Sequence, residues 1–202
     1  MRILIKADNL WYEKEGKILL KNVSLEIFQN DFVVLEGKNG SGKSILCQLL
    51  SFKKSPTQGA ITAEKKYPLF SDRVSLLENK TVKENIKFLL PKMDSYDATF
   101  EVTELLKSLN LFEKRNSLPK ELSTGQRKLL KIATFLVLEE ELIFFDEPFL
   151  GLDEENKHTV LEKLIEKNKS GTTIFIATSD FSTTQIFNKR HFLVKDGDIY
   201  EL

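Results

Sequence analysis

The sequence predicts an α/β fold with a mainly parallel β-sheet, antiparallel strands before it and a helical insertion within it. Residues 142–145 and 173–177 are short, apolar throughout and contain no proline, as is typical of strands buried on both faces of a parallel sheet. Residues 153–167, between them, begin with acidic residues and have apolar residues at helical spacing, which predicts an amphipathic helix. This alternation of buried strands and helices favours a parallel sheet.

The first part of the chain predicts strands of another kind. Residues 3–10, 23–27 and 32–35 form strand-like runs, and the polar stretches EKEGK and FQND separate them. Short polar turns of this kind connect antiparallel neighbours. We therefore expect antiparallel pairing among these strands.

The middle of the chain interrupts the alternation and predicts helices. Thr81 and Glu84 have the spacing of a capping box at the start of one helix, and residues 101–111 indicate a second helix. A chain of 202 residues has the usual length of one domain. We expect a single domain, residues 1–202, with a helical subdomain inserted at about residues 71–125.

Composition argues against several classes of partner. Thirty basic and thirty acidic residues cancel, so no overall charge attracts the chain to nucleic acid or anionic lipid, and we expect no nucleic-acid partner. Cys47 is the lone cysteine, which favours a reducing compartment. Lys6 and Asp8 interrupt the start where a signal peptide would be apolar, and no apolar run has membrane-spanning length. We expect a cytoplasmic protein that reaches a membrane only through a partner.

The stretch GKNGSGKS has the spacing G-x-x-x-x-G-K-S between a strand-like and a helix-like segment. Glycines allow the backbone to curl so that its N–H groups converge on phosphate oxygens, and a helix N-terminus adds a favourable dipole. Lys43 would place a charge on the outer phosphates, and Ser44 a hydroxyl on magnesium. The predicted phosphate-binding residues of this phosphate loop are Gly37, Asn39, Gly40, Ser41, Gly42, Lys43 and Ser44.

The stretch LIFFDEP ends a predicted buried strand with Asp146 and Glu147. Ligands bind beyond the carboxyl ends of the strands in a parallel sheet. There Asp146 would reach the magnesium shell, and Glu147 would polarise the attacking water. A helix cap followed by proline is the alternative, and it is weaker once a phosphate loop precedes the pair. Both stretches together predict a P-loop NTPase core.

Further motifs carry a resemblance to one family. LSTGQ, at the start of an apolar helix, resembles the LSGGQ signature of ABC-type ATPases, and LGLD (150–153) resembles their D-loop. The residues that lead into the phosphate loop also resemble those of the family. These motifs occur in the family's order, and the resemblance covers essentially the whole chain. A plain helix start is the alternative explanation of LSTGQ, because Ser123 and Gln126 have capping-box spacing.

The resemblance implies a head-to-tail dimer in which each ATP lies between the two subunits. Residues of one subunit would bind and attack the nucleotide, with Glu147 as the catalytic carboxylate and with Mg²⁺ held by Ser44 and Asp146. A signature from the other subunit would cover the γ-phosphate, next to the D-loop residue Asp153. The implied signature residues are Ser123, Thr124, Gly125 and Gln126.

Three positions bear on nucleotide affinity in such a family member. Tyr12 matches the aromatic residue that stacks on adenine, although an ordinary strand-edge tyrosine beside Trp11 is the alternative. Ile45, grouped with the phosphate-binding residues, stands where the family often has threonine, and would lose one phosphate contact. Thr124 replaces a usual glycine of the signature, and its small side chain is expected to be tolerated.

Two family residues that sense the γ-phosphate are missing from their expected positions. Ser179 stands where the family has a switch histidine, and serine is shorter and does not titrate near pH 7. No glutamine occurs between Gln58 and Gln126, so Ser71 or Asp72 occupies the Q-loop position. Losing one positioning donor commonly lowers turnover by about 10²–10³-fold. We therefore expect slow or partner-dependent hydrolysis.

The expected function is that of an ATP-binding subunit of an ABC-type membrane system. It would form a homodimer, or a heterodimer with another ABC ATPase, and drive or gate a separately encoded integral membrane protein. One alternative is a soluble ABC protein without a transport role. The other is a nucleotide-gated binding module with little hydrolysis, which the retained Glu147 disfavours.

Overall fold

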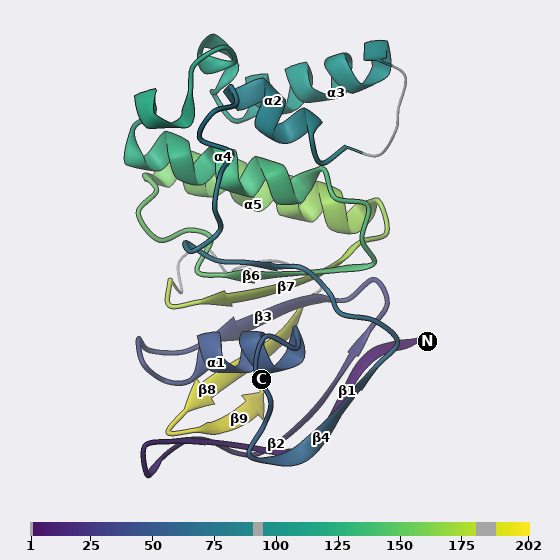
Figure 1. The fold of residues 1–202 in the computed structure, drawn as a ribbon. Coiled ribbons are helices and arrows are strands. Elements are labelled where there is room, and N and C mark those ends of the chain that lie inside the picture. Colours follow the sequence, from purple (N-terminus) through teal and green to yellow (C-terminus); the bar gives the residue numbers. More distant parts are fainter. Residues whose placement is uncertain (1, 91–94, 181–188) are drawn as a thin grey trace. The chain divides into compact units, whose positions relative to one another are not determined.

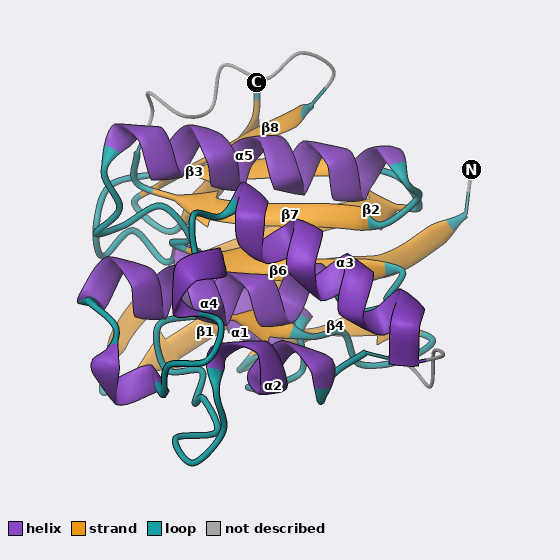
Figure 2. Cartoon of the chain, turned by 90° about the horizontal axis from the view of Figure 1, so that it is seen from above, coloured by secondary structure: helices purple, strands orange, loops and turns teal. Residues whose placement is uncertain are grey.

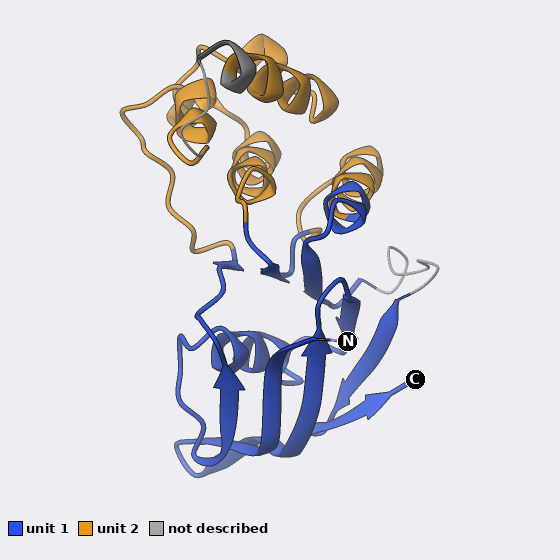
Figure 3. Ribbon diagram, turned by 90° about the vertical axis from the view of Figure 1, so that its right-hand side faces the viewer, with its two compact units in different colours: residues 1–71, 140–148, 165–202 blue, residues 72–139, 149–164 orange. Residues whose placement is uncertain are grey.

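The computed structural model describes residues 2–90, 95–180 and 189–202 (Figure 1). The chain divides into two compact units, coloured separately in Figure 3. The first unit comprises Met1–Ser71, Glu140–Pro148 and Ile165–Leu202, and the second comprises Asp72–Glu139 and Phe149–Leu164. Each unit is described by itself.

The first unit contains an antiparallel sheet in the order β2-β1-β4. Its strands are β1 (Ile3–Lys14), β2 (Lys17–Phe28) and β4 (Gln58–Ala63). Both β2 and β4 pair with β1 in antiparallel register. The antiparallel strands expected near the start of the chain are therefore confirmed for the first two segments.

A second sheet of the first unit has, among the described residues, the order β5-β6-β7-β3-β8-β9. Its neighbouring strands run parallel except for the final β8–β9 pair. The strands are β3 (Phe32–Glu36), β5 (Leu69–Phe70), β6 (Leu142–Asp146), β7 (Thr173–Thr178), β8 (Arg190–Lys195) and β9 (Asp198–Glu201). This mainly parallel sheet confirms the predicted fold class.

The predicted antiparallel pairing of the third segment is wrong. Strand β3 pairs in parallel with β7 and β8, and each of its residues is buried. Its apolar run, FVVLE, therefore has the composition of a strand inside a parallel sheet. The third strand of the antiparallel sheet is β4 instead, whose mostly exposed residues gave no strand signal.

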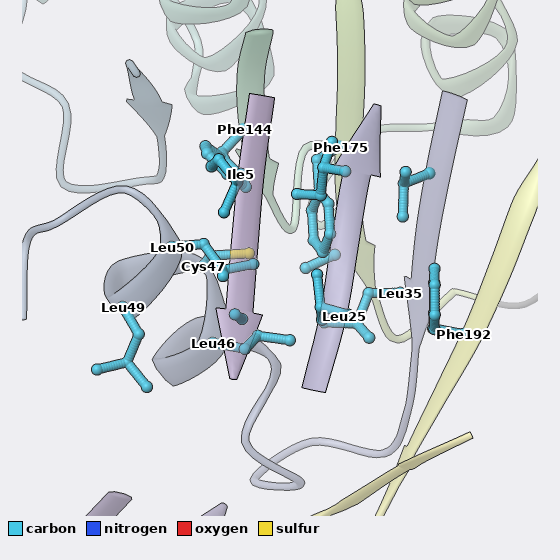
Figure 4. Packing of buried hydrophobic residues seen from close by; sticks show 14 of the residues in the cluster. Ile5, Leu25, Leu35, Leu46, Cys47, Leu49, Leu50, Phe144, Phe175 and Phe192 are labelled. Atoms are coloured by element: carbon cyan, nitrogen blue, oxygen red, sulfur yellow. The ribbon is translucent and has the colours of Figure 1, made fainter. Parts of the chain in front are cut away.

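The core of the first unit joins both sheets to helix α1 (Lys43–Leu50), as Figure 4 shows. Cys47 of this helix belongs to the same cluster as Ile5 and Leu25 of the antiparallel sheet. The cluster also contains Phe144 and Phe175 of the parallel sheet, whose ring centroids lie 5.2 Å apart. Helix α1 therefore begins at the phosphate loop and is anchored on apolar contacts from both sheets.

The second unit contains helices, drawn in purple in Figure 2. They are α2 (Val82–Lys87), α3 (Ser95–Ser108), α4 (Thr124–Leu136) and the first part of α5 (Glu154–Lys169), with 3-10 turns at Phe112–Lys114 and Pro119–Glu121. In the described ranges, no helix combines the length and apolar character needed to cross a bilayer. The predicted helical subdomain lies almost wholly within this unit, and its boundaries stay a prediction.

Both predicted capping boxes are present in this unit. The Ser123 hydroxyl accepts a hydrogen bond from the Gln126 N–H at 3.2 Å, and the Gln126 side chain accepts one from the Ser123 N–H at 3.1 Å. The pair Thr81 and Glu84 does the same at α2. Helix α3 ends earlier than expected, because Asn110 adopts a left-handed backbone with φ of 55° that stops a helix.

The ring contact between Phe144 and Phe175 provides a test of the core. We expect Phe175→Ala to lower the free energy of unfolding by about 3–5 kcal/mol, because a buried aromatic leaves a cavity. The measurement is urea unfolding followed by the fluorescence of Trp11, the lone tryptophan, which lies in the first unit. Tyr200→Ala, at a half-exposed position of β9, is the control and should change the value by less than about 0.5 kcal/mol. Equal effects of the two substitutions would contradict this packing.

Candidate functional site

The phosphate loop follows β3 and leads into α1. Gly42 has φ of 112°, and a side chain there would approach the Leu19 carbonyl at 2.9 Å. A side chain at Gly37 would meet the Val194 carbonyl at 2.7 Å. Gly42 is also the N-cap of α1 and gives the helix no side-chain cap. The first N–H groups of α1 therefore suit an anion, which a helix N-terminus binds readily.

Lys43, the first residue of α1, extends its side chain into the curl of the loop. Its ammonium donates to the carbonyl oxygens of Gly37 at 2.8 Å and Lys38 at 3.1 Å. It also pairs with Glu147 Oε1 at 3.2 Å, and only 4% of its side chain is exposed. A buried cation with such acceptors is suited to phosphate oxygens, which offer the same kind of contact.

Ser44 and Asp146 provide oxygen atoms beside this lysine. The Ser44 hydroxyl donates to Asp146 Oδ1 at 2.8 Å, and Asp146 is the buried last residue of β6. Mg²⁺ prefers oxygen ligands and commonly takes one or two from protein and others from phosphate and water. Within the described residues, no group of three or more acidic, histidine or cysteine side chains could hold a metal. The two oxygen atoms of Ser44 and Asp146 fit a magnesium ion that arrives with a phosphate ligand, since Mg²⁺ takes only one or two ligands from the protein at such sites.

Glu147 lies directly after β6 and is held from several sides. Its N–H donates to the Ala177 carbonyl at 2.8 Å, and its backbone has φ of 51°, in the left-handed region. Its Oε2 accepts hydrogen bonds from the Ser179 N–H at 3.0 Å and from the Ser179 hydroxyl at 3.2 Å. Ser179 therefore contacts the candidate catalytic carboxylate, a contact that the sequence alone did not predict.

Cys47 lies one helical turn beyond Lys43 and is fully buried. Burial raises the pKa of its thiol well above the usual value, and the carboxylates of Asp146 and Glu147 raise it further. The thiol is consequently a neutral part of the core beneath the loop. It carries no nucleophilic role in this environment.

A cavity of about 730 Å³ lies beside the apex of the phosphate loop. It is bounded by loop residues 38–41, the start of β2 and the turn between β8 and β9, where the Lys21 N–H donates to the Gly197 carbonyl at 2.8 Å. The lysines of its lining are Lys17, Lys21, Lys38 and Lys195. This concentration of positive charge favours an anionic ligand. Lys17 and Lys21 are close in the sequence, but Lys38 and Lys195 lie far from them and from each other, so only the fold could reveal the cavity.

Tyr12 and Ile45 lie close to the same core. Tyr12 is on β1 opposite Leu20, and the Lys54 ammonium lies 5.6 Å from its ring centroid. Ile45 is in the first turn of α1 and packs partly against the core cluster. The cavity beside the loop is lined by other residues, so adenine stacking on Tyr12 stays a prediction.

The second unit gathers the signature-like and D-loop-like residues. Ser123 is the N-cap of α4, and Thr124, Gly125 and Gln126 form its first turn. Asp153 precedes α5, where its Oδ1 accepts from the Asn156 N–H at 2.9 Å. A hollow of about 470 Å³ is lined by Asp72, Thr124, Arg127, Lys128, Lys131, Leu150 and Gly151. Ser71 is the other candidate for the Q-loop position. It belongs to the first unit, as the last residue of the segment Met1–Ser71.

These features define a class of protein. A strand that leads through a glycine loop to a helix, with a buried lysine, a serine and paired carboxylates beside it, is the arrangement of P-loop nucleotide-binding proteins. The chain belongs to the ABC transporter family, whose model matches residues 20–150. The family suggested by the LSTGQ and LGLD stretches is therefore confirmed.

Known proteins similar to this chain agree with that assignment. An uncharacterized ABC transporter ATP-binding protein of Methanocaldococcus jannaschii is 31% identical over 98% of this chain and 99% of its own length. The macrolide export ATP-binding/permease protein MacB of Mannheimia succiniciproducens is 32% identical over 98% of this chain and 34% of its own. The dimeric ATP-binding cassette MJ0796, solved with ADP and Pi, has a TM-score of 0.82 at 25% identity, over 98% of this chain and 97% of its own. Proteins of this family are ATP-binding subunits, and the fold is that of their cassettes.

The lone cysteine offers a test of the environment beneath the phosphate loop. We expect Cys47 in the native protein to react with a thiol reagent at pH 8 at least about 1,000-fold more slowly than in urea, because only about 10⁻³–10⁻⁶ of native molecules are unfolded. The raised pKa acts in the same direction, since the reactive thiolate forms only at higher pH. Cys47→Ser gives the blank rate. Fast labelling of native protein would contradict the burial.

Proposed function

We propose that this chain binds Mg–ATP at the phosphate loop and hydrolyses it slowly, as the ATP-binding subunit of a membrane ABC system. The observation that carries the proposal is the cluster of Lys43, Ser44, Asp146 and Glu147, joined by contacts of 2.8 Å and 3.2 Å. Lys43 and the N-terminus of α1 would bind the phosphates. Ser44 and Asp146 would hold Mg²⁺, which supplies charge neutralisation on the phosphate oxygens when it is bound.

Glu147 would accept a proton from, or orient, the attacking water. In the structure its two carboxylate oxygens contact different groups, Lys43 on Oε1 and Ser179 on Oε2. Phosphate oxygens would compete for Lys43 and so release one side of this carboxylate. The remaining contacts from Ser179 would then hold Glu147 in place next to the γ-phosphate.

Slow hydrolysis follows from the groups at the two positions where the family has sensors. Ser179 directs its hydroxyl to Glu147, and a serine cannot also reach a γ-phosphate as an imidazole would. Asp72 pairs with Lys128 at 3.1 Å and, as a carboxylate, cannot donate a hydrogen bond as the amide of a glutamine does. Hydrolysis would therefore depend on contacts supplied by a partner.

We also propose an ATP-dependent dimer, supported by the dimeric cassette of the same fold. The signature residues Ser123–Gln126 and Asp153 would face the ATP bound by the other subunit. Thr124 is exposed at the N-terminus of α4, which is a suitable end of a helix for phosphate. The same geometry would serve a homodimer or a heterodimer.

The membrane partner would dock on an apolar hollow of about 270 Å³ in the second unit. Phe88, Leu77 and Leu89, which line it, are 73%, 39% and 37% exposed. Exposed apolar side chains gathered around a hollow commonly mark a protein-binding surface. A cytoplasmic helix of a permease is the proposed occupant, because the similar protein MacB joins an ATP-binding part to a permease by name. The complex would hold this chain at the cytoplasmic face of the membrane.

The catalytic proposal is tested by steady-state ATP hydrolysis of the purified protein with Mg–ATP. We expect a turnover on the order of 0.01–0.1 per second, about 10²–10³-fold below a typical enzyme, because two positioning groups are missing. Glu147→Gln should lower the rate to background while ATP binding remains. A turnover of several per second for the isolated protein would contradict attenuation.

Substitutions at Ser179 test whether the absence of a histidine at this position is what makes turnover slow. Ser179→His restores a long donor and should raise turnover by about tenfold, whereas Ser179→Ala removes one contact to Glu147 and should not raise it. If the two variants show the same rate, the absence of the imidazole is not what limits hydrolysis.

The docking proposal is tested by binding to washed membranes of the source organism. Phe88→Glu places a charge in the apolar hollow and should weaken co-sedimentation by at least about tenfold, because a charge is costly to bury in an interface. Phe100→Glu is a matched control, since Phe100 is 62% exposed on α3 and lies outside the lining. Protease treatment of the membranes should abolish binding of the wild type. Equal binding by both variants would exclude this hollow as the docking site.

A further inference from the structure

Lys128 occupies a position of α4 where an apolar residue is expected. It lies four residues before Ile132, so the two share the buried face of the helix. Only 8% of its side chain is exposed. A lysine on such a face usually extends its ammonium to water. Here the ammonium is directed to other parts of the second unit.

Two acceptors from distant parts of the sequence hold this ammonium. It donates to the backbone carbonyl of Leu150 at 2.5 Å and pairs with Asp72 Oδ1 at 3.1 Å. Lys131, on the next position of the same helix face, donates to the backbone carbonyl of Asp72 at 2.6 Å. Residue 72 is therefore bound twice by α4, once through its side chain and once through its main chain.

Leu150 belongs to a tight turn that leads to Asp153 and α5. The Leu152 N–H donates to the Phe149 carbonyl at 3.1 Å, and Gly151 has φ of 81°. The Leu150 side chain is exposed and does not anchor the turn by burial. Its backbone carbonyl, which accepts from Lys128, attaches the turn to α4. Removing the Lys128 ammonium would remove this attachment and leave a partly buried carbonyl without that donor.

We propose that Lys128 is a positioning residue, which holds the D-loop turn (residues 149–152) and residue 72 in fixed positions against α4. The inference rests on the proposed function, because the D-loop and the signature at the N-terminus of α4 act on ATP only in a dimer. Lys128 makes these contacts, to Leu150 and Asp72, within the second unit. It sets the shape of the surface that one copy presents to the nucleotide of the other.

The test compares Lys128→Met with Arg127→Met. Methionine keeps the length of the apolar stem and removes the donors. The control removes the neighbouring cation, whose ion pair with Glu78 at 2.5 Å is partly exposed and involves neither Leu150 nor Asp72. Asp72→Ala is a further variant: it removes the carboxylate acceptor of Lys128 at an exposed site and keeps the bond to Leu150.

The first measurement is amide hydrogen exchange of residues 149–153 in the nucleotide-free protein. We expect exchange about tenfold faster in Lys128→Met and unchanged in Arg127→Met, with a smaller increase in Asp72→Ala. Unchanged exchange in Lys128→Met would overturn the proposal, as would an equal increase throughout the chain, which would indicate a general loss of stability. If Lys128→Met does not fold, Lys128→Gln replaces it, because its side chain is one bond shorter and uncharged, and unchanged exchange of residues 149–153 in that variant overturns the proposal.

The second measurement is ATP-dependent dimerisation in the Glu147→Gln background by sedimentation. We expect Lys128→Met to weaken the dimer by about tenfold or more while the ATP affinity of the monomer stays within about twofold. Dimerisation equal to that of Arg127→Met would overturn the positioning role. If the protein with Lys128 intact forms no dimer with ATP, the proposed function fails, whereas the exchange result still decides whether Lys128 holds the turn.

Discussion

A buried ammonium group raises the free energy of a folded protein unless acceptors surround it, and the first unit is arranged around such a group at Lys43. Its acceptors are the Gly37 and Lys38 carbonyls and the Glu147 carboxylate, which come from the loop after β3 and from the end of β6. The curl of the loop and the positions of these strand ends therefore depend on one another. On the proposed function, phosphate oxygens would compete with the Glu147 carboxylate for a lysine that the loop carbonyls already hold.

Parts of the structure that depend on neighbouring residues could be predicted from the sequence. Both capping boxes use groups three positions apart, and the spacing of the phosphate loop is itself the geometry that its glycines allow. The strands at residues 142–145 and 173–177 are recognisable because burial on both faces leaves no room for polar alternation. The contact of Ser44 with Asp146 follows once β3 and β6 lie in one sheet.

Parts that depend on distant pairing could not be predicted in the same way. The partners of β3 are strands that lie far along the chain, and nothing in the run FVVLE indicates them. The contact between Ser179 and Glu147 requires β6 and β7 to be adjacent, because each residue lies just beyond the end of its strand. Lys128 gives no signal in the sequence, since a lysine at a buried helix position is ordinarily assumed to extend to water.

At position 147, stability and the proposed activity favour different residues, because the backbone of Glu147 is left-handed. A non-glycine side chain in this region carries strain on the order of 1 kcal/mol, which glycine avoids and which asparagine and aspartate tolerate better. The easiest stabilising replacements at this position therefore remove or shorten the carboxylate that the proposed hydrolysis would use. On the proposed function, the glutamate at this position keeps the carboxylate for hydrolysis at a cost in backbone strain that most stabilising replacements would remove.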